Sequence, residues 1–229
     1  MCARFAFFSG KIIKDEFGIT AVPDLALQYN IAPTDVVPIV LRSDGARTLR
    51  FQQWGLVPSW AKDPAMGNKM INARAETLSE KPTFRAAFKA RRCLVPCNGF
   101  FEWTGKKGSK QPHYVHMRSG DPFALAGLWE YWEGVNGALE TFTIITTTAN
   151  ELVSKLHNRM PVIIERRHYD EWLGSFTKNT DRLQRLLAPF SSEQMRSYPV
   201  SSAMNSLRLS GPECIARVSV QETLTGLAD

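Results

Sequence analysis

The sequence predicts a single α+β domain with a curved, mainly antiparallel, barrel-like β-sheet flanked by helices. Three observations lead to this prediction. The chain has 229 residues and is 44% hydrophobic, which is enough for one sizeable core. Its apolar segments are short and rich in β-branched and aromatic residues, as strands are. Strand-like and helix-like segments do not alternate regularly, which argues against a Rossmann-type sheet or a TIM barrel.

Eight segments have the length and composition of strands. They span residues 36–41, 48–54, 93–95, 100–103, 114–117, 123–128, 141–147 and 162–164. Turn-forming residues at 105–108 and 135–138 separate some of them. Helices are expected at residues 83–90, 150–156, 168–173 and 181–187. Asn150 can cap the second helix, and Thr180 or Asp181 the last. We expect one domain over residues 1–220 and a polar tail at 221–229.

Charge and composition narrow the class of protein. There are 28 Lys and Arg against 22 Asp and Glu, which gives a net charge of +6 and favours an anionic partner such as nucleic acid. No apolar run approaches the ~20 residues that cross a bilayer, and the N-terminus lacks a signal-peptide pattern. Four cysteines are too few for a disulfide framework. We therefore expect a reduced, cytoplasmic protein that does not contact membranes. We also expect a monomer, but no pattern in the sequence bears on the oligomeric state.

Cys2 is the most informative residue for chemistry. Its small side chain permits removal of Met1, which leaves an α-amine and a thiol on adjacent carbons. The ordinary pKa values of these groups, ~7.7–8.0 and ~8.5, give both a reactive fraction near neutral pH. Such an aminothiol condenses with an aldehyde to an imine, and the thiol then closes a thiazolidine ring. Alternatively, Cys2 attacks an acyl group with its own amine as base, or is simply a small buried residue.

Three short strings place polar residues where a core would favour apolar ones. In MINARAET, Asn72 and Arg74 share parity, so an extended segment points both to one face. In NGFFEW, Glu102 is a lone carboxylate whose desolvation would raise its pKa, as suits a general acid or base. In LHNRMP, His157 and Arg159 follow a predicted helix. Each residue also has an ordinary structural interpretation, but together with the N-terminal aminothiol the set suits condensation with a carbonyl.

A zinc site is one alternative use of the cysteines. Cys93 and Cys97 precede His113 and His116 in the chain. Only two residues separate the histidines, whereas a standard finger needs three to five. The cysteines also lie in a strand-like run where a small apolar side chain fits. We therefore expect no metal.

Basic and aromatic residues suggest a surface for a single strand of nucleic acid. Such a groove combines cations with rings on which bases stack. The candidate residues are Arg4, Trp54, Trp60, Arg74, Arg91, Arg92, Lys106, Lys107 and Lys110. Pro33 either caps this surface or shapes a turn. The alternative for the charged clusters is a solvated loop.

Six strings together resemble one protein family. They are MCARF at residues 1–5, YNIAP at 29–33, WGLVPSW at 54–60, INARAET at 71–77, GFFEW at 99–103 and LHNRMP at 156–161. In this order they are similar to the SRAP family, the SOS-response-associated peptidase or abasic-site processing family. The match runs from residue 2 to about residue 200. A single string would be weak, but six in order are specific.

The resemblance implies a domain that senses abasic sites in single-stranded DNA and crosslinks to them, with no metal or organic cofactor. It also implies association with the bacterial nucleoid when the protein is bound to DNA. By this analogy Cys2 forms the thiazolidine and Glu102 moves protons. Asn72 lies beside the N-terminus, and His157 lies near the opened sugar. Position 3 is usually Gly in the family and is Ala here, where a methyl group restricts the backbone beside the nucleophile.

The resemblance also assigns the DNA contacts. Phosphate-binding positions match Arg4, Arg74 and Arg159. Strings at the DNA-facing surface contain Pro33, Trp54 and Trp60. Phosphate contacts position DNA without base readout, so binding should tolerate sequence and weaken with salt.

Other functions stay open on the sequence alone. An N-terminal-nucleophile hydrolase would use Cys2 to attack a peptide or amide, as the family's name suggests. A binding module without catalysis would hold single-stranded DNA even when Cys2 is replaced. The imine at an abasic site can also lose the 3′ phosphate by β-elimination, which is lyase activity.

Overall fold

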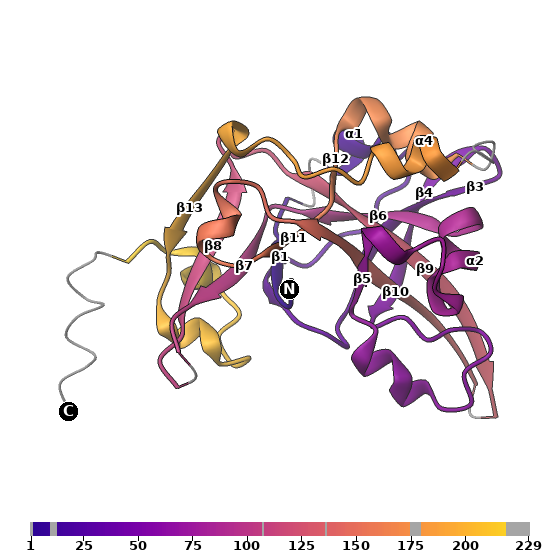
Figure 1. Ribbon diagram of the computed structural model, residues 1–229, viewed down its shortest axis with the longest axis horizontal. Coiled ribbons are helices and arrows are strands. Elements are labelled where there is room, and N and C mark those ends of the chain that lie inside the picture. Colours follow the sequence, from indigo (N-terminus) through magenta and orange to yellow (C-terminus); the bar gives the residue numbers. More distant parts are fainter. Residues whose placement is uncertain (1, 10–12, 107, 136, 175–179, 219–229) are drawn as a thin grey trace.

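The computed structural model describes residues 2–9, 13–106, 108–135, 137–174 and 180–218 (Figure 1). The helices among these residues are α1 (Ile13–Phe17), α2 (Pro82–Ala90), α3 (Tyr169–Leu173) and α4 (Thr180–Arg185). The strands are β1 (Phe5–Phe7), β2 (Gln28–Ile31), β3 (Val36–Ser43), β4 (Ala46–Trp54), β5 (Asn72–Arg74), β6 (Arg92–Cys97), β7 (Gly99–Thr104), β8 (Gln111–Met117), β9 (Phe123–Gly134), β10 (Gly137–Thr148), β11 (Arg159–Pro161), β12 (Ile163–Ile164) and β13 (Met195–Pro199).

Five strands close into a small barrel. They pair in the order β10-β4-β3-β6-β9, and β9 pairs back with β10. All of these pairs are antiparallel except β4 with β10, which runs parallel. Every residue of β6 is buried, which explains why its sequence after Arg92 is continuously apolar instead of alternating. Closure leaves these strands without a free edge over their paired length.

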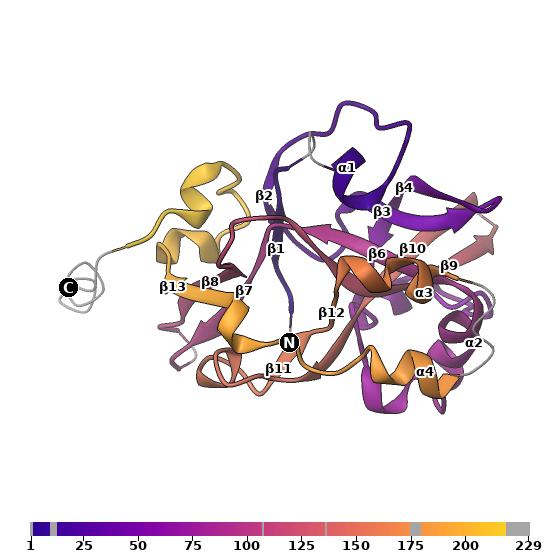
Figure 2. The same ribbon diagram turned by 90° about the horizontal axis from the view of Figure 1, so that it is seen from above.

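The second half of β10 extends beyond the barrel and carries two short strands. There β10 pairs in parallel with β5, through Thr146 and Arg74, and antiparallel with β11, through Thr148 and Arg159. β10 therefore brings chain segments near residues 74 and 159 to either side of one strand. Figure 2 shows the segment before β1 running toward β11.

A second sheet lies beside the barrel, with β1 in its interior. The strand order is β13-β8-β7-β1-β2, and all pairs are antiparallel. One face, which includes Phe5 and Phe100, joins the main hydrophobic core. The other face, which includes Phe101 and Tyr114, is covered by the segment around Met204. Because strand side chains alternate, Glu102 projects to the same face as Phe100.

These observations confirm the predicted α+β class with its curved, mainly antiparallel sheet. The eight predicted strands are present, with ends shifted by a few residues, and three of the predicted helices correspond to α2, α3 and α4. The helix predicted at 150–156 is wrong. Asn150 Oδ1 accepts a hydrogen bond from the Val153 N–H and starts only a 3-10 turn, η3 (Val153–Lys155), because the chain soon joins β10 through β11.

The proposed tail at 221–229 lies outside the described residues. In the part of the chain that the structure describes, no helix has the length and apolarity needed to cross a bilayer.

Candidate active site

Pairing of β1 with β7 brings the N-terminal segment beside Glu102. Phe5 pairs with Phe100 in an antiparallel register. Continuing this register by two residues places Ala3 opposite Glu102. Cys2 is fully buried at this point. The sheet register therefore explains why residues one hundred positions apart meet at the site.

Asn72 contacts the N-terminal segment from the other side. Its Nδ2 donates a hydrogen bond of 2.8 Å to the carbonyl oxygen of Cys2. Its Oδ1 is buried and has no hydrogen-bond partner among the described residues. Trp54 fixes the preceding residue, because its indole Nε1 donates to the Ile71 carbonyl at 2.8 Å. Asn72 thus presents one unused acceptor next to the candidate nucleophile.

Burial sets the acid–base properties of this pair of groups. Only 2% of Glu102 is exposed, and desolvation raises its pKa to about 7, although the positive charge of Lys110 opposes the rise. Burial also raises the pKa of the Cys2 thiol, and the negative charge of Glu102 raises it further. At neutral pH Glu102 therefore exists in both protonation states, as a group that gives and takes protons must.

His157 follows the turn η3 and precedes β11. Its Nδ1 accepts a hydrogen bond of 3.0 Å from the backbone N–H of Arg159. The neutral ring must then carry its proton on Nε2. Burial lowers the pKa of His157, and the positive charge of Arg159 contributes to the same shift. At neutral pH the imidazole is therefore uncharged and can donate a hydrogen bond through Nε2.

Arg159 and Arg74 flank β10, but they differ in their contacts. The guanidinium of Arg159 binds both oxygens of Glu76, at 2.7 and 3.0 Å, and also donates to the Thr146 carbonyl at 2.5 Å. Arg74 is exposed on β5. Thr146 lies opposite Arg74 in the parallel ladder, so the two arginines approach one surface from either side of β10.

Arg4 immediately precedes β1, and its side chain contacts β2 instead of β10. Its guanidinium donates to Asn30 Oδ1 at 2.6 Å, and Asn30 Nδ2 donates to the carbonyls of Ser206 and Leu209, at 3.2 and 2.7 Å. Arg4 is thus held by β2 and the segment after Met204. Pro33 is half-buried in the loop between β2 and β3.

The two predicted stacking residues behave differently. Trp60 is 58% exposed and available for contact. Trp54 is fully buried between Phe5 and Phe142, so the prediction that its ring faces DNA is wrong, and its role in this structure is to pack the core and hold Ile71. A bulky apolar ring between buried strands stabilises the fold more than an exposed one.

The predicted basic groove is also corrected at Arg92. Its guanidinium is buried and donates to the carbonyls of Phe88, Lys89, Trp172 and Gly174. Two of these carbonyls belong to the last turn of α2, where backbone acceptors lack helical partners. Arg92 therefore fastens α2 and α3 to β6 and does not face a ligand.

The cysteines and histidines considered for zinc do not assemble. Within the described ranges there is no group of three or more His, Cys, Asp or Glu side chains that could hold a metal ion. Cys93 and Cys97 are both fully buried in β6. His113 instead contacts Thr104 Oγ1 through Nε2, at 3.1 Å.

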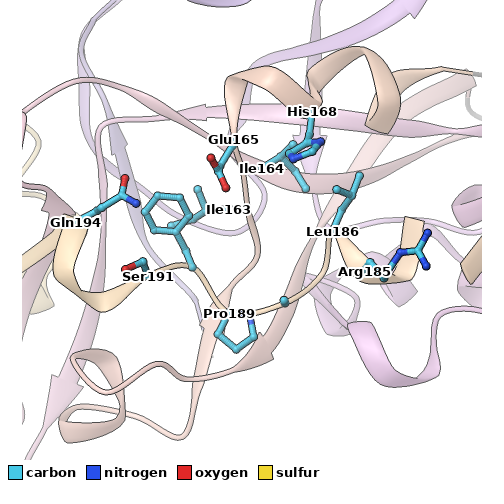
Figure 3. Close-up of a pocket in the computed structure, with 11 residues that line it drawn as sticks. Ile163, Ile164, Glu165, His168, Arg185, Leu186, Pro189, Ser191 and Gln194 are labelled. Atoms are coloured by element: carbon cyan, nitrogen blue, oxygen red, sulfur yellow. The ribbon is translucent and has the colours of Figure 1, made fainter. Parts of the chain in front are cut away.

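A cavity of about 180 Å³ lies apart from these residues (Figure 3). Its walls come from β12, from the 3-10 helix η4 (Arg166–His168) and from the segment after α4. The lining includes Glu165, His168, Arg185 and Phe190 but none of the predicted site residues. This cavity is therefore not part of the candidate site, which is defined by the side chains around Cys2.

Sequence reasoning missed Glu76 and the environment of Lys110. Glu76 lies in the same string as Asn72 and Arg74, but it follows β5 in the 3-10 helix η2 (Ala75–Thr77), so strand parity could not have predicted its contact with Arg159. Lys110 was one member of a charge cluster, and only the β7–β8 pairing reveals that its charge acts on Glu102 and His157.

The site and fold define a class: a small α+β protein in which a buried cysteine at position 2 lies beside a carboxyl and an amide. The chain matches the family model described as SOS response associated peptidase (SRAP) over residues 1–207, and it belongs to that family. The prediction made from the six strings is confirmed.

Named relatives and solved structures agree with this membership. The chain is 42% identical to the abasic site processing protein YoqW of Bacillus subtilis over 221 residues, which cover 94% of this chain and 99% of that protein. It is 32% identical to the abasic site processing protein HMCES of Gallus gallus, over 84% of this chain and 66% of that protein. A crystal structure of a Bacteroides thetaiotaomicron protein superposes with a TM-score of 0.86 at 29% identity, over 95% of this chain and 100% of that one.

Proposed function

We propose that this protein processes abasic sites in single-stranded DNA by forming a covalent bond through Cys2. The observation that carries the proposal is the full burial of Cys2 between Asn72 and Glu102, with a proton-exchanging carboxyl at one side and an amide at the other. The names of the relatives YoqW and HMCES support the same substrate. An abasic deoxyribose supplies the aldehyde that an aminothiol needs.

The chemistry begins with removal of Met1, which frees the α-amine of Cys2. The sugar ring opens to its aldehyde, and Glu102 and His157 move the protons for this step. The amine attacks C1′ and water leaves, so that an imine forms. The thiol sulfur then bonds to C1′, and its proton passes to the imine nitrogen through Glu102. The product is a thiazolidine, and one water is lost in total.

Asn72 and His157 orient the reactants in this scheme. The unused Oδ1 of Asn72 accepts a hydrogen bond from the freed amine, while Nδ2 holds the Cys2 carbonyl. His157 donates from Nε2 to the sugar oxygen. Fixed orientation of two reacting groups lowers the barrier because the entropy of alignment is already lost.

The DNA backbone would follow the cationic surface around the site. Arg74 is exposed and would contact phosphate directly. Arg4 and Arg159, which are held by Asn30 and Glu76, would add positive charge near the DNA backbone. Trp60 offers an exposed ring, and Pro33 a rigid neighbour, to bases beside the lesion. Such contacts carry no base readout, so we propose binding that tolerates sequence.

Intact mass spectrometry of the protein mixed with single-stranded DNA carrying one abasic site tests the proposal. We expect the wild type to lack Met1 and to form an adduct at the summed mass less one water. Cys2→Ala should form no thiazolidine, whereas Cys214→Ala, which removes a buried thiol from the other core cluster, should behave like the wild type. No adduct on a processed Cys2 terminus would overturn the proposal.

The same experiment separates the alternatives. Strand cleavage with loss of the 3′ phosphate would indicate lyase turnover of the imine. Hydrolysis of an amide substrate by the wild type but not by Cys2→Ala would favour the peptidase function that the family description names. Binding that survives Cys2→Ala without any adduct in the wild type would indicate a non-catalytic binding module.

A further inference from the structure

We propose that Glu76 is a positioning residue that holds Arg159 and, through Arg159, orients His157. This inference rests on the proposed function, because it assigns a task within that site. Glu76 lies two residues after Arg74, at the start of the 3-10 helix η2 (Ala75–Thr77) that follows β5. It therefore connects β5, which carries Asn72, with the loop that carries His157.

Glu76 and Arg159 form a bidentate ion pair. Both carboxylate oxygens accept from the two terminal guanidinium nitrogens, at 2.7 and 3.0 Å. This bond to Arg159 lowers the pKa of Glu76, so the carboxyl stays ionised at neutral pH. Parallel charge-assisted hydrogen bonds of this kind fix the plane of a guanidinium as well as its position.

Arg159 is also fixed from a second direction. Its terminal nitrogen donates to the Thr146 carbonyl of β10 at 2.5 Å, and only 15% of its side chain is exposed. Both terminal nitrogens of this guanidinium thus bind acceptors within the protein, while Nε is buried and has no hydrogen-bond partner among the described residues. Arg74 is exposed, so it is the better placed arginine for phosphate. The contacts of Arg159 instead serve the geometry of the loop.

Arg159 transmits this geometry to His157 through its backbone. The Arg159 N–H donates to His157 Nδ1, and the Asn158 carbonyl accepts from the Ala149 N–H at 3.2 Å. Residue 159 is thus held by its pairing with Thr148 of β10 and, through its side chain, by Glu76. Loss of the Glu76 contact removes this side-chain restraint at the first residue of β11, and the hydrogen bond that keeps the His157 proton on Nε2 is then less firmly held.

The test compares Glu76→Gln with Glu80→Gln, which removes the same charge from an exposed position four residues further on. We expect Glu76→Gln to slow the formation of the adduct at saturating DNA on the order of tenfold, as loss of orientation does. Its affinity for intact single-stranded DNA should not fall, because a negative charge is removed from the binding surface. Glu80→Gln should leave the rate unchanged, and Glu76→Asp should restore part of it.

A spectroscopic readout tests the link without any DNA. Nitrogen-15 NMR at pH 8 distinguishes a bare imidazole nitrogen from a protonated one, and loss of a signal in His157→Gln assigns it. We expect Nδ1 of His157 to be bare in the wild type and in Glu80→Gln, and partly protonated in Glu76→Gln. In an Arg159→Lys background, Glu76→Gln should have little further effect on either readout, because neighbours in one network are not additive.

These outcomes separate the two proposals. If the wild type forms no adduct, the proposed function fails, while the NMR comparison still decides the role of Glu76. If the wild type forms the adduct and Glu76→Gln matches it in both rate and tautomer, the positioning role is overturned. The same conclusion follows if Glu76→Gln weakens DNA binding tenfold with an unchanged rate at saturation, since Glu76 would then act only on affinity.

Discussion

Replacement of Glu102 by Gln tests the electrostatics of the site through stability alone. Burial raises the pKa of Glu102 in the folded protein from its ordinary 4.5 to about 7. The folded state therefore holds a proton that the unfolded chain releases, and stability falls as the pH rises between these values. The change corresponds to about 3 kcal/mol in the free energy of unfolding. Gln cannot ionise, so the variant escapes this loss.

Thermal unfolding of both proteins from pH 4.5 to 8.5 measures the effect. The variant's Tm, relative to the wild type, should rise between pH 4.5 and pH 8 by about 6–12 °C, which is what ~3 kcal/mol means for a chain of this size. Any constant cost of the substitution cancels in this comparison. Glu80→Gln, at an exposed position, should give a flat difference. A flat difference for Glu102→Gln as well would refute the claim that burial raises this pKa.

Four further predictions concern single side chains. Asn72→Ala removes the hydrogen bond to the Cys2 carbonyl and should slow adduct formation by about 10–100-fold with little change in Tm; an unchanged rate in gel assays would contradict this. Trp54→Ala should cost about 3–5 kcal/mol in urea unfolding. Trp60→Ala should cost less than about 0.5 kcal/mol of stability and weaken binding to single-stranded DNA; the reverse order would reject the core role of Trp54. Arg74→Ala should reduce the slope of log affinity against log salt by about 0.7, and an equal slope would mean that it touches no phosphate.

The long strands were predictable because each carries several apolar residues in a row or in alternation. β6 has six buried residues, and β9 and β10 have twelve residues each. These strands are therefore long enough to show a recognisable run or alternation of apolar residues in the sequence. β5 and β11 have three residues each, which is too few for any period. Their existence depends on β10, whose free half provides the hydrogen-bonding partner.

The site was predictable in its members but not in its contacts. Asn72, Glu102 and His157 stood out as polar residues in apolar strings. The sequence does not show that Trp54 is buried, because an aromatic residue in a strand is equally compatible with a core and with a stacking surface. Arg92 misled for a related reason: its four carbonyl partners come from α2 and α3, and a charge cluster in the sequence does not show which backbone groups need a donor.

The interior position of β1 has a mechanical consequence. Two residues, Ala3 and Arg4, separate Cys2 from β1, which is hydrogen-bonded to β7 on one side and to β2 on the other. Tension on a DNA strand joined to Cys2 would pull β1 along its own axis, perpendicular to those hydrogen bonds. In this shear geometry the bonds on both sides yield together, whereas an edge strand would peel away one bond at a time. A bond to DNA at Cys2, as proposed above, would therefore resist the pull of a motor that translocates along that DNA.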